Sequence, residues 1–236
     1  MIKAEVASVI ETNLTPLMLS LKVAALSTSF VFVLGMVAAR WMTQKDFWGK
    51  NVLESFFLLP LVLPPTVVGF GLLMLFGKNG FLGKLLQEWF NITVVFTLTG
   101  AVIASIVVSF PLMYQSAVAA FTGVDRRLEN AARTMGASEW RLFWTVSFPL
   151  AWPGLLAGFV LSFARGLGEF GATLMLAGYI PGKTDTIPVA IYFAVEAGQM
   201  DKALFWVIII VSLGMGTTLW LNWWSRRNVR RYANQK

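Results

Sequence analysis

Long apolar runs alternate with short polar stretches along the whole chain. Five of the runs are long enough to cross a bilayer as helices, for which roughly 18 apolar residues suffice. They cover residues 17–39, 52–76, 94–118, 150–177 and 203–224. We therefore predict an all-α integral membrane protein with five transmembrane helices, forming one transmembrane domain over residues 1–236. Residues 77–93 and 178–202, which are punctuated by Gly, Asn and Pro, are predicted to be loops.

The second run is interrupted by three prolines, Pro60, Pro64 and Pro65. Proline removes a backbone donor and clashes with the preceding turn, so this helix is predicted to be kinked or locally opened. The bend either serves packing or lines a pore with freed carbonyl groups, and the sequence leaves both readings open. We call residues 60–65, which carry these prolines, the proline segment. Together with Thr66 and with Ser109 of the third run, its three prolines are candidates for the lining of a translocation pathway.

A polar stretch, residues 123–149, separates the third run from the fourth; we call it the polar segment. Asp125 is placed to cap a first short helix, Gly136 to end it, and Ser138 to cap a second. Helical spacing puts four residues on one apolar stripe: Leu128, Ala131, Ala132 and Met135. Such a helix either lies on lipid headgroups or enters a groove on a soluble partner, and pattern alone favours the headgroups.

The distribution of charge predicts how the chain crosses the membrane. The formal net charge is +7, with 19 Lys and Arg against 12 Asp and Glu, at a mean hydropathy of +0.68. Basic residues gather after the first run, in the polar segment and in the C-terminal tail. By the positive-inside rule these regions, including the C-terminus, are cytoplasmic, and the N-terminus lies outside. The basic charge is thereby explained without nucleic acid as a partner.

Several kinds of chemistry are disfavoured by composition. The chain has no cysteine and no histidine, which removes disulfides, thiolate metal sites and His-based catalysis. It also lacks a GxxxxGK[ST] phosphate-binding loop, so it does not bind ATP by that device. We expect no catalytic residues, no metal site and no cofactor in this chain. An intramembrane enzyme and a membrane scaffold remain as alternatives to a transport subunit.

The polar segment resembles the EAA loop of ABC importer permeases. The family pattern is EAA, three residues, G, nine residues, I-x-L-P. Here Asn130-Ala131-Ala132 precedes Gly136 at the same spacing, and Val146-Ser147-Phe148-Pro149 follows. The sequence departs from the pattern at three positions, where Asn130 replaces Glu, Val146 replaces Ile and Phe148 replaces Leu. Whether Glu129, one position earlier, supplies the missing carboxylate is left open.

The resemblance implies the type I ABC importer (MetI-like) permease fold with a cytoplasmic coupling helix. It implies a multi-pass protein of a bacterial or archaeal inner membrane, working as a homodimer with two ATPase subunits and an external binding protein. ATP and Mg would then bind to the ATPase partner. The residues expected to couple to that partner are Glu129, Asn130, Ala131, Ala132, Arg133 and Gly136.

Three further stretches are similar to the molybdate branch of these oxyanion permeases. They are PLVLPPTVVG at 60–69, SFARGLGEFGAT at 162–173 and IPGKTDTIPVAIY at 180–192. Sulfate permeases share variants of the first two, so the third favours molybdate. The resemblance therefore implies import of an oxyanion, with molybdate ahead of tungstate, sulfate and thiosulfate.

Arg165 and Glu169 stand four residues apart in the fourth run, on one face of a helix. Ionisable groups inside a membrane are costly and face protein or a water-filled cavity. The pair either locks helix packing or lines the anion route, with Arg165 supplying a positive field. Packing is favoured, because a paired Arg is partly neutralised and tight anion binding slows release.

Overall fold

The computed structural model describes residues 14–233, and every regular element in that part of the chain is helical. Four helices or helix runs are long and apolar enough to cross a membrane alone: Thr15–Gln44, Leu98–Thr122, Glu139–Leu167 and Met200–Leu221. A fifth crossing requires the bent pair Lys50–Val62 and Pro65–Phe76. The all-α membrane fold is confirmed, and residues 1–13, including the N-terminus, lie outside the described residues.

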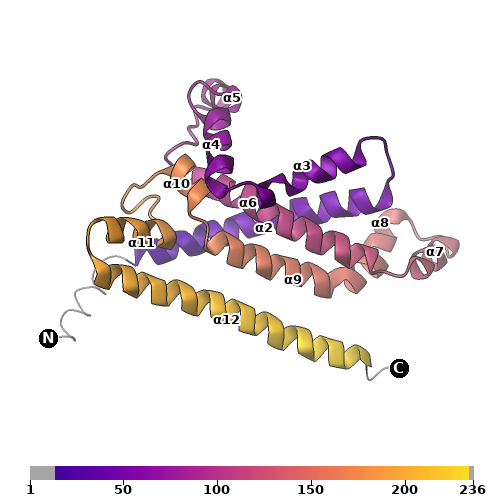
Figure 1. The fold of residues 1–236 in the computed structure, drawn as a ribbon. Coiled ribbons are helices and arrows are strands. Elements are labelled where there is room, and N and C mark those ends of the chain that lie inside the picture. Colours follow the sequence, from indigo (N-terminus) through magenta and orange to yellow (C-terminus); the bar gives the residue numbers. More distant parts are fainter. Residues whose placement is uncertain (1–13, 234–236) are drawn as a thin grey trace.

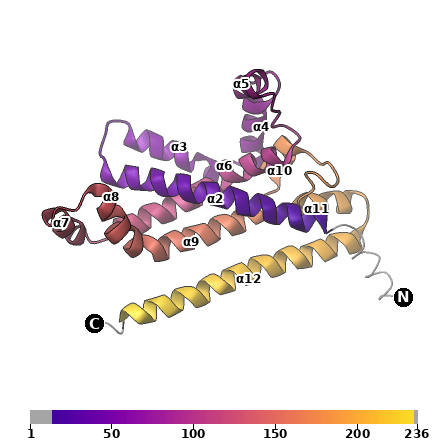
Figure 2. The ribbon, with the colours of Figure 1, turned by 180° about the vertical axis from the view of Figure 1, so that it is seen from behind.

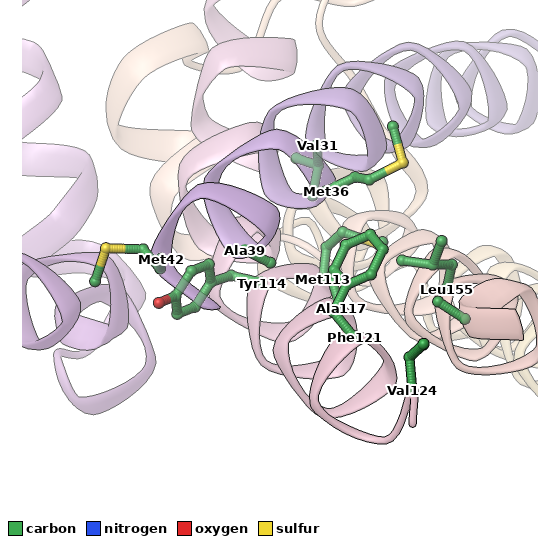
Figure 3. Packing of buried hydrophobic residues seen from close by; sticks show 11 residues of the cluster. Val31, Met36, Ala39, Met42, Met113, Tyr114, Ala117, Phe121, Val124 and Leu155 are labelled. Carbon is green, nitrogen blue, oxygen red and sulfur yellow. The ribbon is translucent and has the colours of Figure 1, made fainter. Parts of the chain in front are cut away.

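Helices α2 (Thr15–Gln44), α6 (Leu98–Thr122) and α9 (Phe148–Leu167) pack side by side to form the core. Figure 3 shows part of this core, where Val31 and Ala39 of α2 meet Met113 and Ala117 of α6. Small residues allow the close approach: a Cβ on Gly158 of α9 would lie 2.6 Å from the Ser116 Cβ. Close packing of small residues is a main source of helix association in lipid.

The second predicted span is bent rather than straight. It consists of α3 (Lys50–Val62) and α4 (Pro65–Phe76), whose axes differ by 115° at the break. Pro60 is tolerated inside α3, whereas Leu63 and Pro64 adopt extended backbone and end the helix. The proline segment therefore opens the helix as predicted. In Figure 1, α4 stands nearly across the direction of the core helices.

The fourth predicted span, 150–177, is also divided. Its helical run starts earlier, with α8 (Glu139–Leu142) and a π-helical turn, η1 (Phe143–Ser147), leading into α9. Helix α9 ends at Leu167, and the short α10 (Gly171–Ala177) follows after a three-residue break. The side chain of Glu169 accepts the Ala172 N–H (2.8 Å), which satisfies a free donor in the first turn of α10.

Two stretches predicted as loops contain helices. Residues 77–93 include α5 (Phe81–Phe90), and residues 178–202 include α11 (Ile187–Glu196). Each is short and follows turn-forming residues, Gly and Asn before α5 and Gly and Pro before α11, which mark a turn but do not prevent a helix beyond it. Helix α11 begins with Pro188 in its first turn, a position where a missing N–H costs nothing.

The remaining helix, α12 (Met200–Ala233), lies along one side of the molecule against α9 and α11. It extends beyond the predicted span of 203–224. Figures 1 and 2 place its C-terminal end at the same end of the molecule as α7 (Arg126–Thr134) and α8. Helices α10 and α11 and the start of α2 lie at the other end of the molecule.

Candidate functional site

The polar segment forms a helical hairpin at one end of the core (Figure 1). Asp125 caps α7 by accepting the Arg127 N–H at 2.8 Å, and Ser138 caps α8 by accepting the Arg141 N–H at 3.4 Å. Both caps were predicted from the sequence. They supply acceptors for backbone donors that a helix N-terminus leaves free.

Gly136 ends α7 in the left-handed region, with φ of +84°. The Ala137 N–H reaches the Ala132 carbonyl (3.0 Å) and the Gly136 N–H reaches the Arg133 carbonyl (2.9 Å). This pair of bonds is a Schellman motif, which favours glycine because its positive φ disfavours a side chain. The predicted termination of the helix is therefore confirmed, and it fixes the turn into α8.

The predicted apolar stripe of α7 is divided between solvent and protein. Leu128 and Ala131 are exposed, and Met135 is 82% exposed. Ala132, in contrast, is only 6% exposed and packs within the chain. Only part of the predicted stripe is thus open to a partner, because Ala132 faces the protein. The free surface consists of Leu128, Ala131 and Met135.

Glu129 points the opposite way from that surface, into the protein. Its Oε1 accepts hydrogen bonds from Arg40 Nη1 (3.0 Å) and from Ser147 Oγ (2.5 Å). Its Oε2 lies 4.0 Å from Arg133 Nη2. Three parts of the chain therefore meet at one carboxylate: the end of α2, the helix α7 and the π-helical turn η1.

The electrostatic surroundings keep Glu129 charged. Burial alone would raise the pKa of Glu129, but hydrogen bonds from Ser147 and Arg40 and the charges of Arg40 and Arg133 outweigh it. The pKa of the carboxyl therefore lies below its ordinary value. The ionised Glu129 therefore stabilises the folded protein fully at neutral pH, and this stabilisation is lost only as the pH falls through that lowered pKa.

The other predicted residues of the polar segment lie at the surface. Asn130 is exposed, and its Oδ1 accepts a hydrogen bond from Arg133 Nη1 at 3.0 Å. Arg133 also donates to both carboxylate oxygens of Glu139, at 2.6 and 3.1 Å. The amide of Asn130 thus faces outward while the neighbouring carboxylate of Glu129 faces inward. The two side chains are not interchangeable.

The predicted pathway residues come together in part where the two divided spans meet. A Cβ on Gly171, at the start of α10, would lie 3.2 Å from Pro65 Cβ and 3.3 Å from the Thr66 backbone N. Helix α4 packs along α10, with Gly69 against Ala172. Pro65 and Thr66 therefore lie beside the break that contains Glu169. Pro64 is exposed at its own break, and Pro60 lies one turn earlier, half-buried in α3.

Ser109 belongs to a different environment, inside the core. It is fully buried on α6, and its Oγ has no hydrogen-bond partner among the described residues. A Cβ on Gly166 of α9 would lie 3.6 Å from this oxygen, so Ser109 packs against the α9 backbone. The structure does not place it beside the proline segment.

Arg165 and Glu169 form an ion pair across the end of α9, with Nη1 and Oε2 2.7 Å apart. The Glu169 side chain is 2% exposed and the Arg165 side chain 30%. One charge is thus buried and paired, whereas part of the guanidinium remains accessible. This geometry suits both roles considered for the pair, locking of helix packing and lining of the anion route. In either role the buried Glu169 carboxylate needs Arg165 to compensate its charge.

Two residues that the sequence reading did not select are central to the polar segment. Arg40 and Ser147 bind Glu129. Arg40 belongs to no motif, and Ser147 stands at the one position of I-x-L-P where the EAA pattern accepts any residue. The available signal for Arg40 was a single cation at the end of an apolar run. Nothing in the spacing identified its partner, which is 89 positions away.

Comparisons with known proteins agree with this architecture. The family model described as binding-protein-dependent transport system inner membrane component matches residues 31–232. YvgM of Bacillus subtilis, provisionally named a molybdenum transport system permease protein, is 53% identical over 197 residues, covering 84% of this chain and 87% of that protein. The molybdenum transport system permease protein ModB of Escherichia coli K12 is 46% identical over 210 residues, covering 89% and 92%.

Among solved structures, the inward-facing MetNI methionine ABC transporter contains a chain with a similar fold. The TM-score is 0.66 at 14% sequence identity, over 90% of this chain and 94% of that chain. This likeness concerns the fold alone. The family match over residues 31–232 shows that the chain belongs to the inner membrane components of binding-protein-dependent transport systems, and its apolar helices and fold are those of a multi-pass transport permease of the type I ABC importer fold.

Proposed function

We propose that the chain is the permease subunit of an ATP-driven importer that carries molybdate into the cytoplasm. The observation that carries this proposal is the 46% identity to E. coli ModB over nearly the full length of both chains. The segment 180–192 supports the same substrate class. Its loop is tightly built: Thr184 Oγ1 accepts the Ile180 N–H (2.9 Å), and Asp185 accepts the Gly182 N–H (2.9 Å).

In the proposed assembly two copies of the chain pair with two ATPase subunits and receive substrate from an external binding protein. ATP and Mg bind to the ATPase subunits and not to this chain. The exposed face of α7, made by Leu128, Ala131 and Met135, enters a cleft of the ATPase. An apolar helix face flanked by charges is suited to such a groove.

The proposed orientation has the polar segment and the C-terminus in the cytoplasm and the N-terminus outside. It is supported by the shared location of the α2–α3 turn, α7–α8 and the end of α12. These are the regions in which Lys and Arg gather. The surface around Pro65, Thr66 and Arg165, where the two divided spans meet, is proposed to border the anion route. Discontinuous helices commonly form substrate sites in transporters.

The test is uptake by the complete complex in vesicles, with radioactive molybdate as the tracer. ATP-dependent uptake that unlabelled tungstate and molybdate suppress, and that sulfate in equal concentration leaves intact, is the expected result. Sulfate or thiosulfate competing better than molybdate would reassign the substrate to another oxyanion. Uptake that does not require ATP, or no uptake of any of these oxyanions by an assembled complex, would contradict the proposal that the complex is an ATP-driven importer.

A further inference from the structure

The ion pair of Glu129 and Arg40 joins two elements that otherwise pack little on each other. Helix α7 packs mainly on α8 and on the π-helical turn η1, rather than on α2. Arg40 lies near the end of α2, and its Nη1 reaches the Glu129 Oε1 across 89 positions of the chain. This contact therefore provides a direct mechanical connection between α7 and α2.

The Arg40 side chain is itself held in place. Its guanidinium carbon lies 5.6 Å from the ring centre of Phe121 on α6 and 5.8 Å from that of Phe143 in η1. Gln44, with its amide oriented to suit its neighbours, accepts from Arg40 Nη2 (2.7 Å) and Nε (3.1 Å). Aromatic faces attract a guanidinium, and the planar fork is fixed by several bonds at once. Arg40 is thus a rigid anchor.

Ser147 supplies the second connection, on the side of α9. It is fully buried, it is the last residue of the π-helical turn, and its Oγ donates to the same Glu129 oxygen. The turn closes with the Phe148 N–H on the Phe143 carbonyl, and α9 continues directly from it. π-Helical turns are rare and often occur at functional positions. Here the turn holds the Glu129 carboxylate at the start of a core helix.

We propose that Glu129 is a positioning residue that transmits movement of α7 to α2 through Arg40 and to α9 through Ser147. This inference rests on the proposed function, because it takes the ATPase partner as the source of the movement. A buried charge that loses its partner is strongly disfavoured, so the three groups move together. Displacement of α7 then reaches two core helices as one rigid motion, and hydrolysis is converted into uptake.

The test measures molybdate uptake and ATP hydrolysis in the same vesicles, using the complete complex with its binding protein. Glu129→Gln keeps the size of the side chain but removes the charge that holds Arg40. We expect assembly and ATP hydrolysis to persist while uptake per ATP falls about tenfold, within the range of coupling effects of single substitutions. Arg40→Gln should lower uptake per ATP to the same extent. The double variant should show no further loss, because both substitutions remove one and the same contact.

The matched control is Asp46→Asn, which breaks the exposed Lys50–Asp46 pair at the same end of the molecule (2.8 Å). Uptake per ATP should remain at the wild-type value in this variant. A wild-type ratio in Glu129→Gln, or additive effects of the Glu129 and Arg40 substitutions, would overturn the proposal.

Ser147→Ala covers the case in which Glu129→Gln fails to assemble. It removes one hydrogen bond and leaves the ion pair, and we expect an assembled complex with a smaller loss of uptake per ATP. If Ser147→Ala has the wild-type ratio while Glu129→Gln does not assemble, Glu129 serves folding alone and the proposal fails. Absence of uptake by the wild-type complex would instead contradict the proposed function. Failure of the proposed function and failure of the role proposed for Glu129 are therefore distinguishable.

Discussion

At the scale of single residues, two buried carboxylates show how an ionic group is retained in an apolar protein. Glu169 is 3% exposed, and its two oxygens are used by Arg165 and by the Ala172 N–H. Glu129 is held by Arg40 and Ser147. A buried ion pair adds little net stability, but removing one partner leaves an uncompensated charge. Each pair therefore constrains which substitutions the chain tolerates.

Arg165→Gln tests the packing role of the pair in the middle of the divided fourth span. Because it strands the buried Glu169 carboxylate, we expect destabilisation of about 3 kcal/mol, read as a lower thermal unfolding temperature in detergent. Arg165→Gln with Glu169→Gln should recover much of this loss, since no unpaired charge remains. Unchanged stability of Arg165→Gln together with abolished uptake would place Arg165 on the anion route instead.

At the scale of elements, the sequence predicted what depends on local chemistry and missed what depends on distant partners. Asp125, Gly136 and Ser138 were identified because a cap or a positive φ is dictated by neighbouring residues. The prolines predicted a break, but they do not specify its angle of 115°, at which α4 packs on α10. The inward orientation of Glu129 likewise required Arg40, a partner that no local pattern reveals.

The two alanines of α7 provide a test of which face meets the ATPase. Ala131 is exposed and Ala132 is 6% exposed, so they differ in accessibility but belong to the same helix. In an assembled complex, Ala131→Cys should cross-link to a cysteine in the ATPase cleft at least about tenfold faster than Ala132→Cys, because a thiolate must be accessible to react. Equal rates, or faster reaction of Ala132→Cys, would show that α7 docks by a different face.

At the scale of the whole molecule, the two ends of the bundle differ in chemistry. The end formed by α7, α8 and the α2–α3 turn carries most of the basic residues that lie between the spans. The opposite end carries the loop 178–186, α11 and the α11–α12 turn. Helix α2, with 30 residues, is about 45 Å long and exceeds the hydrocarbon thickness, so both ends reach water. Orientation then follows from which end retains the positive charge.

The absence of cysteine makes this orientation directly measurable, because every introduced thiol is a unique label. Trp48, in the α2–α3 turn, is fully exposed, and Lys183 in the loop 178–186 and Gln199 in the α11–α12 turn at the other end are exposed as well. In spheroplasts, whose inner membrane is intact, a membrane-impermeant maleimide should label Lys183→Cys and Gln199→Cys within minutes. Trp48→Cys should react only after permeabilisation, since the thiolate must meet the reagent in water. Labelling of Trp48→Cys alone in intact cells would invert the topology, placing the proposed ATPase surface outside and contradicting the importer.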